Sequence, residues 1–379
     1  MRKQIKILQI SESSETGGAE TVLLNIVENL DKAKYHSIVV LLKTGWLNQK
    51  LEESGFSPIL LTSVRSYDIS LLVRLWLNVK KHDIDIIHSH LPDVNAYSCL
   101  AGFAARVPVV TTYHGMIAGS QEQTRSDKLK FFLVRSLSTR IVAVSDALKN
   151  ELVQLAQFPP RKLTTIYNGV HWERFDRPID AVSKRIKLGI GPEDKVIGIV
   201  ANLKATKGYQ YFIRAAAIIS KNITKVKFLI IGEEEERLKA TIVEEIKAIG
   251  LEDRVVFLGF REDVPELLRI LDVFVLSSIS EGMSIATVEA MGAGVPVVVT
   301  KSGGPQELVE DGKTGFLVPP KDENSLAEKV LLLLKDKELA TSMGKEAQAQ
   351  ARTRFSIDMM IRDYQAVYQE CLRKGERQV

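Results

Sequence analysis

Short, continuously apolar segments alternate with helical segments along nearly the whole chain, and this alternation constrains the fold more than any other feature. Strands that are apolar on both faces are typical of parallel sheets covered by helices on both sides. The first half is therefore predicted to form a doubly wound α/β domain. Its predicted strands are at residues 5–10, 37–42, 84–89, 109–113, 140–145 and 163–167.

The same alternation starts again after residues 177–192, a segment rich in proline and glycine with no strand pattern. We therefore predict two Rossmann-like doubly wound parallel-sheet domains facing each other across a cleft, at 1–178 and 179–354. A C-terminal helix at 355–379 is expected to pack back on the first domain. Ligands of such sheets bind beyond the carboxyl ends of the strands. The second set of predicted strands lies at 196–201, 227–231, 255–258, 273–276, 295–300 and 315–318.

Composition excludes several other classes of protein. Of the 379 residues, 45% are hydrophobic and 26% are charged, as in ordinary folded proteins. The two cysteines, Cys99 and Cys371, cannot build a disulfide framework or a cysteine zinc site. No signal peptide or membrane span is predicted, so we expect a cytoplasmic protein. A net charge of +4 is too mild to indicate nucleic-acid binding.

Two glutamates around one strand-to-helix loop give the strongest local signal. Glu281 lies in the loop after the predicted strand at 273–276, and Glu289 lies about one turn into the next helix. The first amides of a helix lack intrahelical partners and carry the positive end of its dipole, which suits a diphosphate. Glutamates near a helix start are also common as capping groups, so the pair alone does not decide the function.

The context of these glutamates resembles the E-x7-E motif of glycosyltransferase family 4, and the resemblance extends over nearly the whole chain. It implies a GT-B fold, with the acceptor bound mainly by the first domain and the nucleotide sugar mainly by the second. It also implies sugar transfer with retention of configuration, without a catalytic metal or a cofactor. Further matching motifs are Gly17-Gly18, His114-Gly115, Ser145-Asp146, Asn168-Gly169-Val170, Lys207-Gly208 and Gly303-Gly304.

The resemblance assigns roles around the E-x7-E motif. Glu289 would hold the ribose hydroxyls of the nucleotide, and Glu281 would lie near the hydroxyls of the donor sugar. The backbone of Met283, Ser284 and Ile285 would contact the sugar and the phosphates.

Three other positions are expected near the donor. Lys207 would neutralise the diphosphate leaving group. His114 would hydrogen-bond a sugar hydroxyl or support the transition state, although a lone histidine after a strand is usually structural. Gly17 and Gly18 would close over the phosphates, although two glycines before a helix are also ordinary turn chemistry.

One position departs from the family pattern. An arginine often lies five residues before the lysine, and Asn202 occupies this position here. Lys204, in the same loop, is a candidate replacement cation. Phe260 and Arg261 follow a predicted strand and are expected to border the nucleotide base.

His88 and His90 form a His-x-His pair that is common in zinc sites. No third or fourth ligand is evident, so the pair is interpreted as the end of a strand. No metal site is expected.

The sequence thus predicts a hexosyltransferase-type enzyme that moves a sugar from a nucleotide sugar, with a UDP-sugar favoured, to a glycan or lipid-linked acceptor. Two alternatives stay open: a UDP-sugar epimerase of the same shape, and a non-catalytic nucleotide-sugar-binding subunit. The basic, apolar segment at 125–140 either packs on its own domain or lies on an anionic membrane. Peripheral attachment to the inner face of the membrane is therefore a further possibility.

Overall fold

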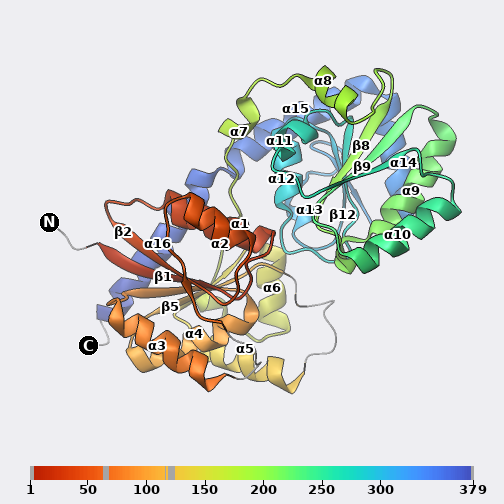
Figure 1. Ribbon diagram of the computed structural model, residues 1–379. Helices are drawn as coiled ribbons and strands as arrows, with labels where there is room; N and C mark the ends of the chain where they lie inside the picture. The colour runs from red at the N-terminus through yellow and green to blue at the C-terminus, as the bar shows by residue number, and fades with distance from the viewer. Residues whose placement is uncertain (1–3, 63–67, 116, 118–123, 377–379) are drawn as a thin grey trace. The chain divides into compact units, whose positions relative to one another are not determined.

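The computed structural model describes residues 4–62, 68–115, 117 and 124–376. The chain divides into two compact units (Figure 1): Met1–Gly169 together with Ile357–Val379, and Val170–Ser356. Each unit contains one parallel sheet with helices, so the predicted α/β class with two doubly wound domains is confirmed.

The first unit is built on a seven-stranded sheet in the order β3-β2-β1-β4-β5-β6-β7, with every pair parallel. Apart from Ile5, the apolar residues of its central strands β1, β4 and β5 are buried, as the sequence pattern required. Its strands are β1 (Ile5–Ser11), β2 (Tyr35–Leu41), β3 (Ile59–Leu60), β4 (Ile86–His90), β5 (Val109–Tyr113), β6 (Arg140–Ala143) and β7 (Leu163–Thr165). Its helices are α1 (Gly18–Asn29), α2 (Trp46–Glu53), α3 (Ile69–Lys81), α4 (Pro92–Ala105), α5 (Arg125–Leu137), α6 (Asp146–Gln154) and α16 (Ile357–Glu376).

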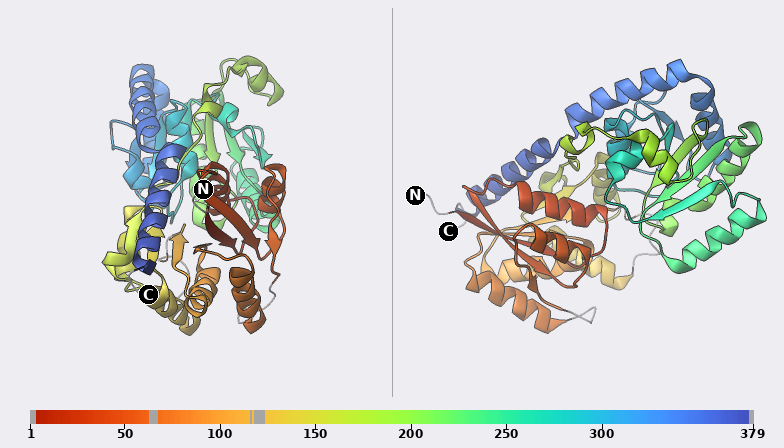
Figure 2. Two further views of the ribbon diagram at one scale, coloured as in Figure 1. Left: turned by 90° about the vertical axis from the view of Figure 1, so that its left-hand side faces the viewer. Right: turned by 45° about the horizontal axis from the view of Figure 1, so that its top comes forward.

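The last helix, α16, lies against α1 and β4 of this unit (Figures 1 and 2). Tyr364, Tyr368 and Cys371 on its inner face are completely buried. The C-terminal helix therefore contributes polar and aromatic groups to the interior beside the central strands.

The second unit has a six-stranded parallel sheet in the order β10-β9-β8-β11-β12-β13. Its strands are β8 (Lys195–Val200), β9 (Val226–Ile231), β10 (Val255–Gly259), β11 (Val273–Leu276), β12 (Val297–Thr300) and β13 (Phe316–Val318). Its helices are α7 (Glu173–Asp176), α8 (Ala181–Lys187), α9 (Tyr209–Asn222), α10 (Glu236–Ala248), α11 (Val264–Leu268), α12 (Ile285–Gly292), α13 (Pro305–Leu308), α14 (Glu323–Lys335) and α15 (Lys337–Arg354).

Strand order reverses at one place in each sheet. From β8 the chain moves outward through β9 and β10, and then returns to the other side of β8 with β11, β12 and β13. Such a reversal leaves a crevice at the carboxyl ends of the two strands that flank it. In the second unit those strands are β8 and β11.

The units divide after Gly169, earlier than the predicted boundary at residue 178. The intervening residues pack within the second unit: a side chain at Gly292 would meet the ring of Trp172 at 2.1 Å. The backbone N–H of Val170 also donates to the carbonyl of Phe355 at 2.9 Å. The predicted boundary lay at the cluster of proline and glycine. The observed boundary lies earlier, because Trp172 packs against Gly292 and so belongs to the second unit.

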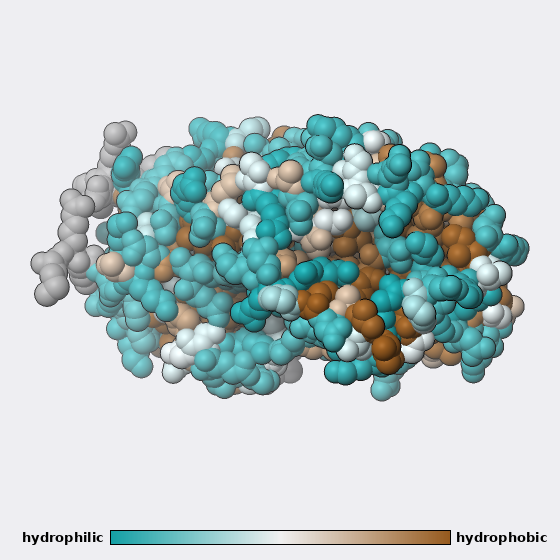
Figure 3. Space-filling model, turned by 90° about the horizontal axis from the view of Figure 1, so that it is seen from above, coloured by the Kyte–Doolittle hydropathy of each residue, from teal (hydrophilic) through white to brown (hydrophobic). Residues whose placement is uncertain are grey.

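No helix in the described part of the chain is long and apolar enough to cross a bilayer. The face shown in Figure 3 is covered mainly by hydrophilic side chains, with apolar groups in smaller patches.

Candidate functional site

The loops after β8, β11 and β12 approach one another so closely that two glycines are required. Gly208 has a φ of +64°, and a Cβ there would lie 2.2 Å from the carbonyl oxygen of Ser277. A Cβ on Gly304 would lie 1.8 Å from the carbonyl oxygen of Gly282. Only glycine fits such contacts without moving the backbone. The three loops therefore form one structure at the switch point of the sheet.

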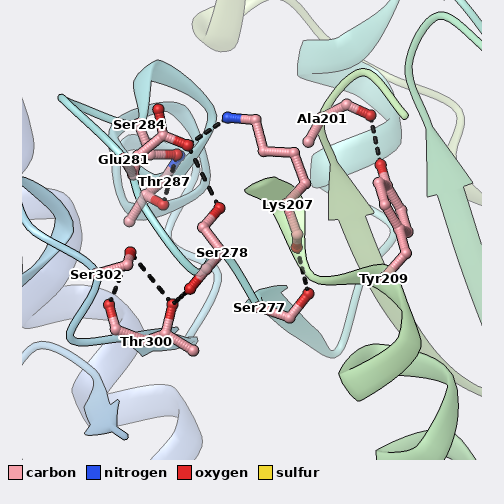
Figure 4. Close-up of polar contacts among 10 residues, drawn as sticks. All are labelled: Ala201, Lys207, Tyr209, Ser277, Ser278, Glu281, Ser284, Thr287, Thr300 and Ser302. Carbon is pink, nitrogen blue, oxygen red and sulfur yellow. Dashed lines mark hydrogen bonds and ion pairs between the residues drawn. The ribbon is translucent and has the colours of Figure 1, made fainter. Parts of the chain in front are cut away.

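Lys207 and Glu281 form an ion pair inside this structure (Figure 4). The Ser278 hydroxyl donates to the same Glu281 carboxylate at 3.3 Å, and the Ser277 hydroxyl donates to the carbonyl of Lys207 at 2.9 Å. The two charged side chains are only 21% and 12% exposed. The structure therefore brings together two predicted site residues and holds a cation next to a carboxylate.

Backbone hydrogen bonds fix the loop that carries Glu281. Its N–H donates to the carbonyl of Ser302 at 2.9 Å, and its carbonyl accepts from the N–H of Gly304 at 3.0 Å. The β12 loop thus positions the first glutamate of the motif, which sequence reasoning did not foresee. Gly303 and Gly304 are the signal for this contact in the sequence, because a side chain at Gly304 would meet the carbonyl oxygen of Gly282.

The start of α12 leaves backbone donors available. Ser284 caps the helix by accepting from the N–H of Thr287 at 3.1 Å, so its side chain is already used. The N–H groups of Ser284, Ile285 and Ala286 have no hydrogen-bond partner within the described residues. These donors and the helix dipole favour an anion. Met283, also predicted to contribute its backbone, has a buried side chain.

Glu289 lies on α12 and is half-buried. Its carboxylate accepts no hydrogen bond from the described residues, unlike that of Glu281. Burial raises the pKa of Glu289 to about 7, and the positive charge of Arg174 opposes this rise. A desolvated carboxylate without donors is suited to accept hydrogen bonds from ligand hydroxyls.

Asn202, at the position where the family often has arginine, joins two loops. Its side-chain oxygen accepts from the N–H of Glu233 at 3.1 Å, which ties the β8 loop to the β9 loop. Lys204 is exposed in the same loop. The structure thus gives Asn202 a bridging contact and leaves Lys204 at the surface.

Phe260 and Arg261 follow β10, and the structure uses them differently. Phe260 presents an exposed aromatic ring. Arg261 makes a bidentate ion pair with Asp263, with both N–O distances 2.7 Å. That pairing, together with Lys184, holds the pKa of Asp263 well below its usual range. The guanidinium of Arg261 is therefore already engaged.

In the first unit, Gly17 and Gly18 lie at the start of α1. Gly17 is extended, a conformation that any residue adopts, and no side chain caps the helix. A Cβ at Gly17 would come within 2.5 Å of the Glu20 carboxylate. A carboxylate thus already lies at the helix start where phosphates were expected.

His114 directly follows β5 and lies beside a second histidine. Its Nε2 lies 3.1 Å from Nδ1 of His90, and the two rings are stacked. Its Nδ1 is buried without a partner in the described residues. Burial lowers the pKa of His114 to about 3, so the ring is neutral near pH 7.

His88 and His90 were interpreted only as a strand end, and the structure shows a buried polar cluster around them. His88 contacts Tyr368 and Thr112, and His90 contacts Gln9 and His114. The available signal was the spacing, since residues two apart in a strand point to one face. Within the described residues, no group of three or more His, Cys, Asp or Glu could hold a metal ion.

Comparisons with known proteins agree over most of the chain. Residues 16–174 match the family model described as Glycosyltransferase Family 4, and residues 181–350 match the one described as Glycosyl transferases group 1. The chain is 31% identical over 315 residues to N-acetyl-alpha-D-glucosaminyl L-malate synthase of Bacillus anthracis, covering 81% of this chain and 80% of that protein. It is 29% identical over 353 residues to the UDP-Gal:alpha-D-GlcNAc-diphosphoundecaprenol alpha-1,3-galactosyltransferase of Escherichia coli, covering 89% of each.

A solved structure shows the same similarity. Anabaena Alr3699/HepE in complex with UDP and glucose matches with a TM-score of 0.89 and 26% sequence identity, over 97% of this chain and 100% of that one. The same protein has also been solved with UDP-glucose, with the same TM-score. The predicted family and fold are therefore confirmed: the chain belongs to glycosyltransferase family 4 and is a glycosyltransferase of the GT-B fold.

Proposed function

We propose that this enzyme transfers a sugar from a UDP-sugar to a hydroxyl of a glycan or lipid-linked acceptor, with retention of anomeric configuration. One observation carries the proposal: Lys207, Glu281 and the free amides of α12 converge at the switch point of the second sheet. The UDP and UDP-glucose complexes of the Anabaena protein and the UDP-Gal in the name of the Escherichia coli relative support the choice of nucleotide.

The donor is held by groups from three loops. Glu289 accepts hydrogen bonds from the ribose hydroxyls, and the amides at the start of α12 bind the diphosphate and the sugar. Lys207 leaves Glu281 for the diphosphate as negative charge develops on the leaving group. Glu281 is then free to accept from the sugar hydroxyls. The ion pair thus keeps both groups in position until the donor binds.

Secondary donor contacts follow from exposure and charge. Asn202 occupies the position where the family often has an arginine. Lys204 supplies the second positive charge for the diphosphate instead, because it is exposed in the same loop. Phe260 stacks on the base through its exposed ring, with Arg261 at the border and held there by Asp263.

The first unit contributes His114, whose neutral ring contacts a sugar hydroxyl, and Gly17 and Gly18, which approach the donor phosphates. No side chain is assigned as a nucleophile. The bond between the anomeric carbon and the leaving phosphate oxygen breaks, and the acceptor oxygen bonds to the same face of that carbon. The acceptor proton passes to the leaving phosphate, so the reaction balances without a metal or a cofactor.

The nucleotide preference is tested by thermal unfolding with UDP-, GDP- and ADP-sugars. A ligand at 100 times its Kd stabilises the protein by about 2.7 kcal/mol, and we expect a rise in Tm with UDP-sugars alone, also without added metal. A rise with another nucleotide only would overturn the UDP assignment. No rise with any of them at millimolar concentration would count against the whole site.

Labelled UDP-sugar with a pool of acceptors then separates the alternatives for the same site. Label in a larger product supports transfer. Isomerised donor indicates an epimerase, and binding without turnover indicates a non-catalytic subunit.

We also propose peripheral attachment of a cytoplasmic enzyme to an anionic membrane, through a docking face on α3, α4 and α5. These helices pack side by side and carry seven Lys or Arg against two Asp, a net charge of +5. Exposed apolar groups lie among these charges, as on helices that rest on lipid. The name of the Escherichia coli relative includes an undecaprenol-linked substrate, which fits an enzyme at a membrane. The apolar groups of the docking face are Ile69, Val73, Leu77, Phe103, Leu129 and Phe132.

Sedimentation with phosphatidylglycerol vesicles tests this attachment. We expect the enzyme to bind them, and a Leu129→Ser, Phe132→Ser variant to bind several-fold less. A Val182→Ser, Ile186→Ser variant is the matched control, because both side chains are exposed apolar groups on α8 of the other unit. Equal loss in both variants, or no binding by the wild type, would refute the docking face.

A further inference from the structure

A chain of hydrogen bonds runs through the interior of the first unit and ends at His114. It joins groups from three elements and one loop: Gln9 of β1, His90 of β4, His114 after β5, and Tyr368 of α16. Gln9, His90 and Tyr368 have no exposed surface. These three groups are therefore isolated from solvent, and each depends on its neighbours for a donor or an acceptor.

The direction of this chain follows from its atoms. Gln9 Nε2 donates to the Tyr368 hydroxyl at 3.3 Å, so the carbonyl oxygen of the Gln9 amide faces His90. That oxygen lies 3.3 Å from His90 Nε2, which therefore carries the proton of the neutral ring. His90 Nδ1 is then a lone pair. It lies 3.1 Å from His114 Nε2, which must be the donor.

A second branch leaves Tyr368 in a consistent direction. Because its oxygen accepts from Gln9, its own proton is available for His88 Nδ1, 2.8 Å away. The other nitrogen of His88 carries a proton and donates to the Thr112 hydroxyl at 2.7 Å. Every group of this second branch thus finds a partner, and Tyr368 is the junction of the two branches.

His114 is the open end of the chain. With its proton on Nε2, its Nδ1 presents a lone pair. This nitrogen is buried and has no hydrogen-bond partner in the described part of the chain. A buried acceptor without a donor is costly unless a ligand supplies one.

We propose that Tyr368, Gln9 and His90 are positioning residues that hold the proton of His114 on Nε2, so that its Nδ1 accepts a hydrogen bond from a hydroxyl of the carbohydrate ligand. Only the identity of the ligand rests on the proposed function, because the tautomer belongs to the free enzyme. The C-terminal helix therefore sets the chemistry of a side chain that it does not contact through any hydrogen bond in the described chain.

This arrangement makes His114 selective. A neutral ring with a bare Nδ1 binds a hydroxyl, which can donate, and disfavours a phosphate oxygen, which can only accept. A donor or acceptor sugar in which the contacted hydroxyl is methylated would lose this bond.

Nuclear magnetic resonance of histidine-¹⁵N-labelled full-length enzyme reads the tautomer directly. We expect the wild type to show His114 protonated on Nε2 and bare on Nδ1. In Tyr368→Phe the Gln9 amide loses its acceptor and can flip, so that its NH₂ group faces His90 Nε2. His90 would then carry its proton on Nδ1 and donate it to His114 Nε2, so both tautomers of His114 should appear. Gln9→Leu removes the amide itself and should have the same effect, which covers the case that Tyr368→Phe fails to fold.

Tyr364→Phe is the matched control. Tyr364 is equally buried on the same helix, and its hydroxyl lies near Thr112 but outside hydrogen-bond geometry. Its removal should leave the tautomer of His114 unchanged. Protonation of His114 on Nδ1 in the wild type would overturn the proposal. So would a single Nε2 tautomer that persists in both Tyr368→Phe and Gln9→Leu.

Kinetics separate this inference from the proposed function. We expect Tyr368→Phe to lower kcat by up to about tenfold, the effect of one hydrogen bond lost in all molecules, with unchanged Kd for UDP. Tyr364→Phe should keep wild-type kcat. If the wild type transfers no sugar, the proposed function fails, and the spectra still decide the tautomer. If it transfers sugar and Tyr368→Phe has normal kcat with mixed tautomers, the role assigned to Nδ1 is refuted.

Discussion

We expect the carboxyl group of Glu289 to make nucleotide affinity depend on pH. Its pKa is raised to about 7 by burial. If it accepts hydrogen bonds from the ribose, only the ionised form binds well, so the Kd rises as pH falls below this pKa. With a pKa near 7, the ionised fraction falls about tenfold between pH 8 and pH 6. The Kd should therefore rise about tenfold, or about 1.4 kcal/mol.

The same group is expected to destabilise the enzyme in the absence of nucleotide. Because the folded pKa lies above the unfolded one, folding takes up a proton between them, and stability falls as pH rises through that window. The penalty is absent below pH 4.5 and complete above about pH 7. A shift from 4.5 to about 7 corresponds to about 3 kcal/mol as an upper bound, since the side chain is partly hydrated. Glu289→Gln should recover much of it at pH 8.

Calorimetric titration with UDP-glucose at pH 6, 7 and 8 measures the binding, because this donor has no terminal phosphate that titrates in this range. We expect Glu289→Gln to weaken binding by about 1.5–3 kcal/mol at pH 8 and to abolish the pH dependence. Urea unfolding without nucleotide should show that Glu289→Gln is more stable than wild type at pH 8. This difference in the free energy of unfolding should be smaller at pH 5.

Glu328→Gln, at an exposed ion pair with Lys329, is the control and should change neither measurement. The reasoning fails if wild-type affinity is independent of pH, or if Glu289→Gln keeps the same pH dependence. A variant less stable than wild type at pH 8 would also contradict it.

Three further predictions concern the same loops. Lys207→Met should lower kcat about 10²–10³-fold and cost only about 1–2 kcal/mol of stability, because its ion pair is partly exposed; equal kcat would exclude it as a phosphate contact. Gly208→Ala should cost about 3 kcal/mol or more in urea unfolding, against about 1 for Gly189→Ala, whose Cβ meets nothing within 4 Å; equal costs would refute the loop contact. Chelation with EDTA should leave kcat unchanged, and loss restored by Mg²⁺ would reveal a required metal.

Most of the fold could be predicted because its strands are apolar on both faces. The strand at β1 and the strand at β8 were both recognised from runs of Ile, Leu and Val. The edge strand β3 was missed, since Ile59 and Leu60 alone are too short to show a period. The boundary between units was displaced because packing of Trp172 cannot be read from local sequence.

The candidate site also contains features that local sequence shows and contacts that it does not show. Glu281 and Glu289 lie in one contiguous motif on one loop and helix, so their spacing alone made them candidates. The Lys207–Glu281 ion pair depends on two loops 74 residues apart. The hydrogen bond from Gln9 to Tyr368 joins residues 359 positions apart, and nothing in the local sequence of either residue indicates it.

The stereochemistry of transfer tests the central claim most directly. Wild-type enzyme is incubated with ¹³C-labelled UDP-glucose and the acceptor found in the pool assay, and the anomeric carbon of the first product is followed by nuclear magnetic resonance. Retention predicts an α-linked product from the α-configured donor, and Lys207→Met should form it more slowly with the same configuration. A β-linked product would contradict retaining transfer at this site.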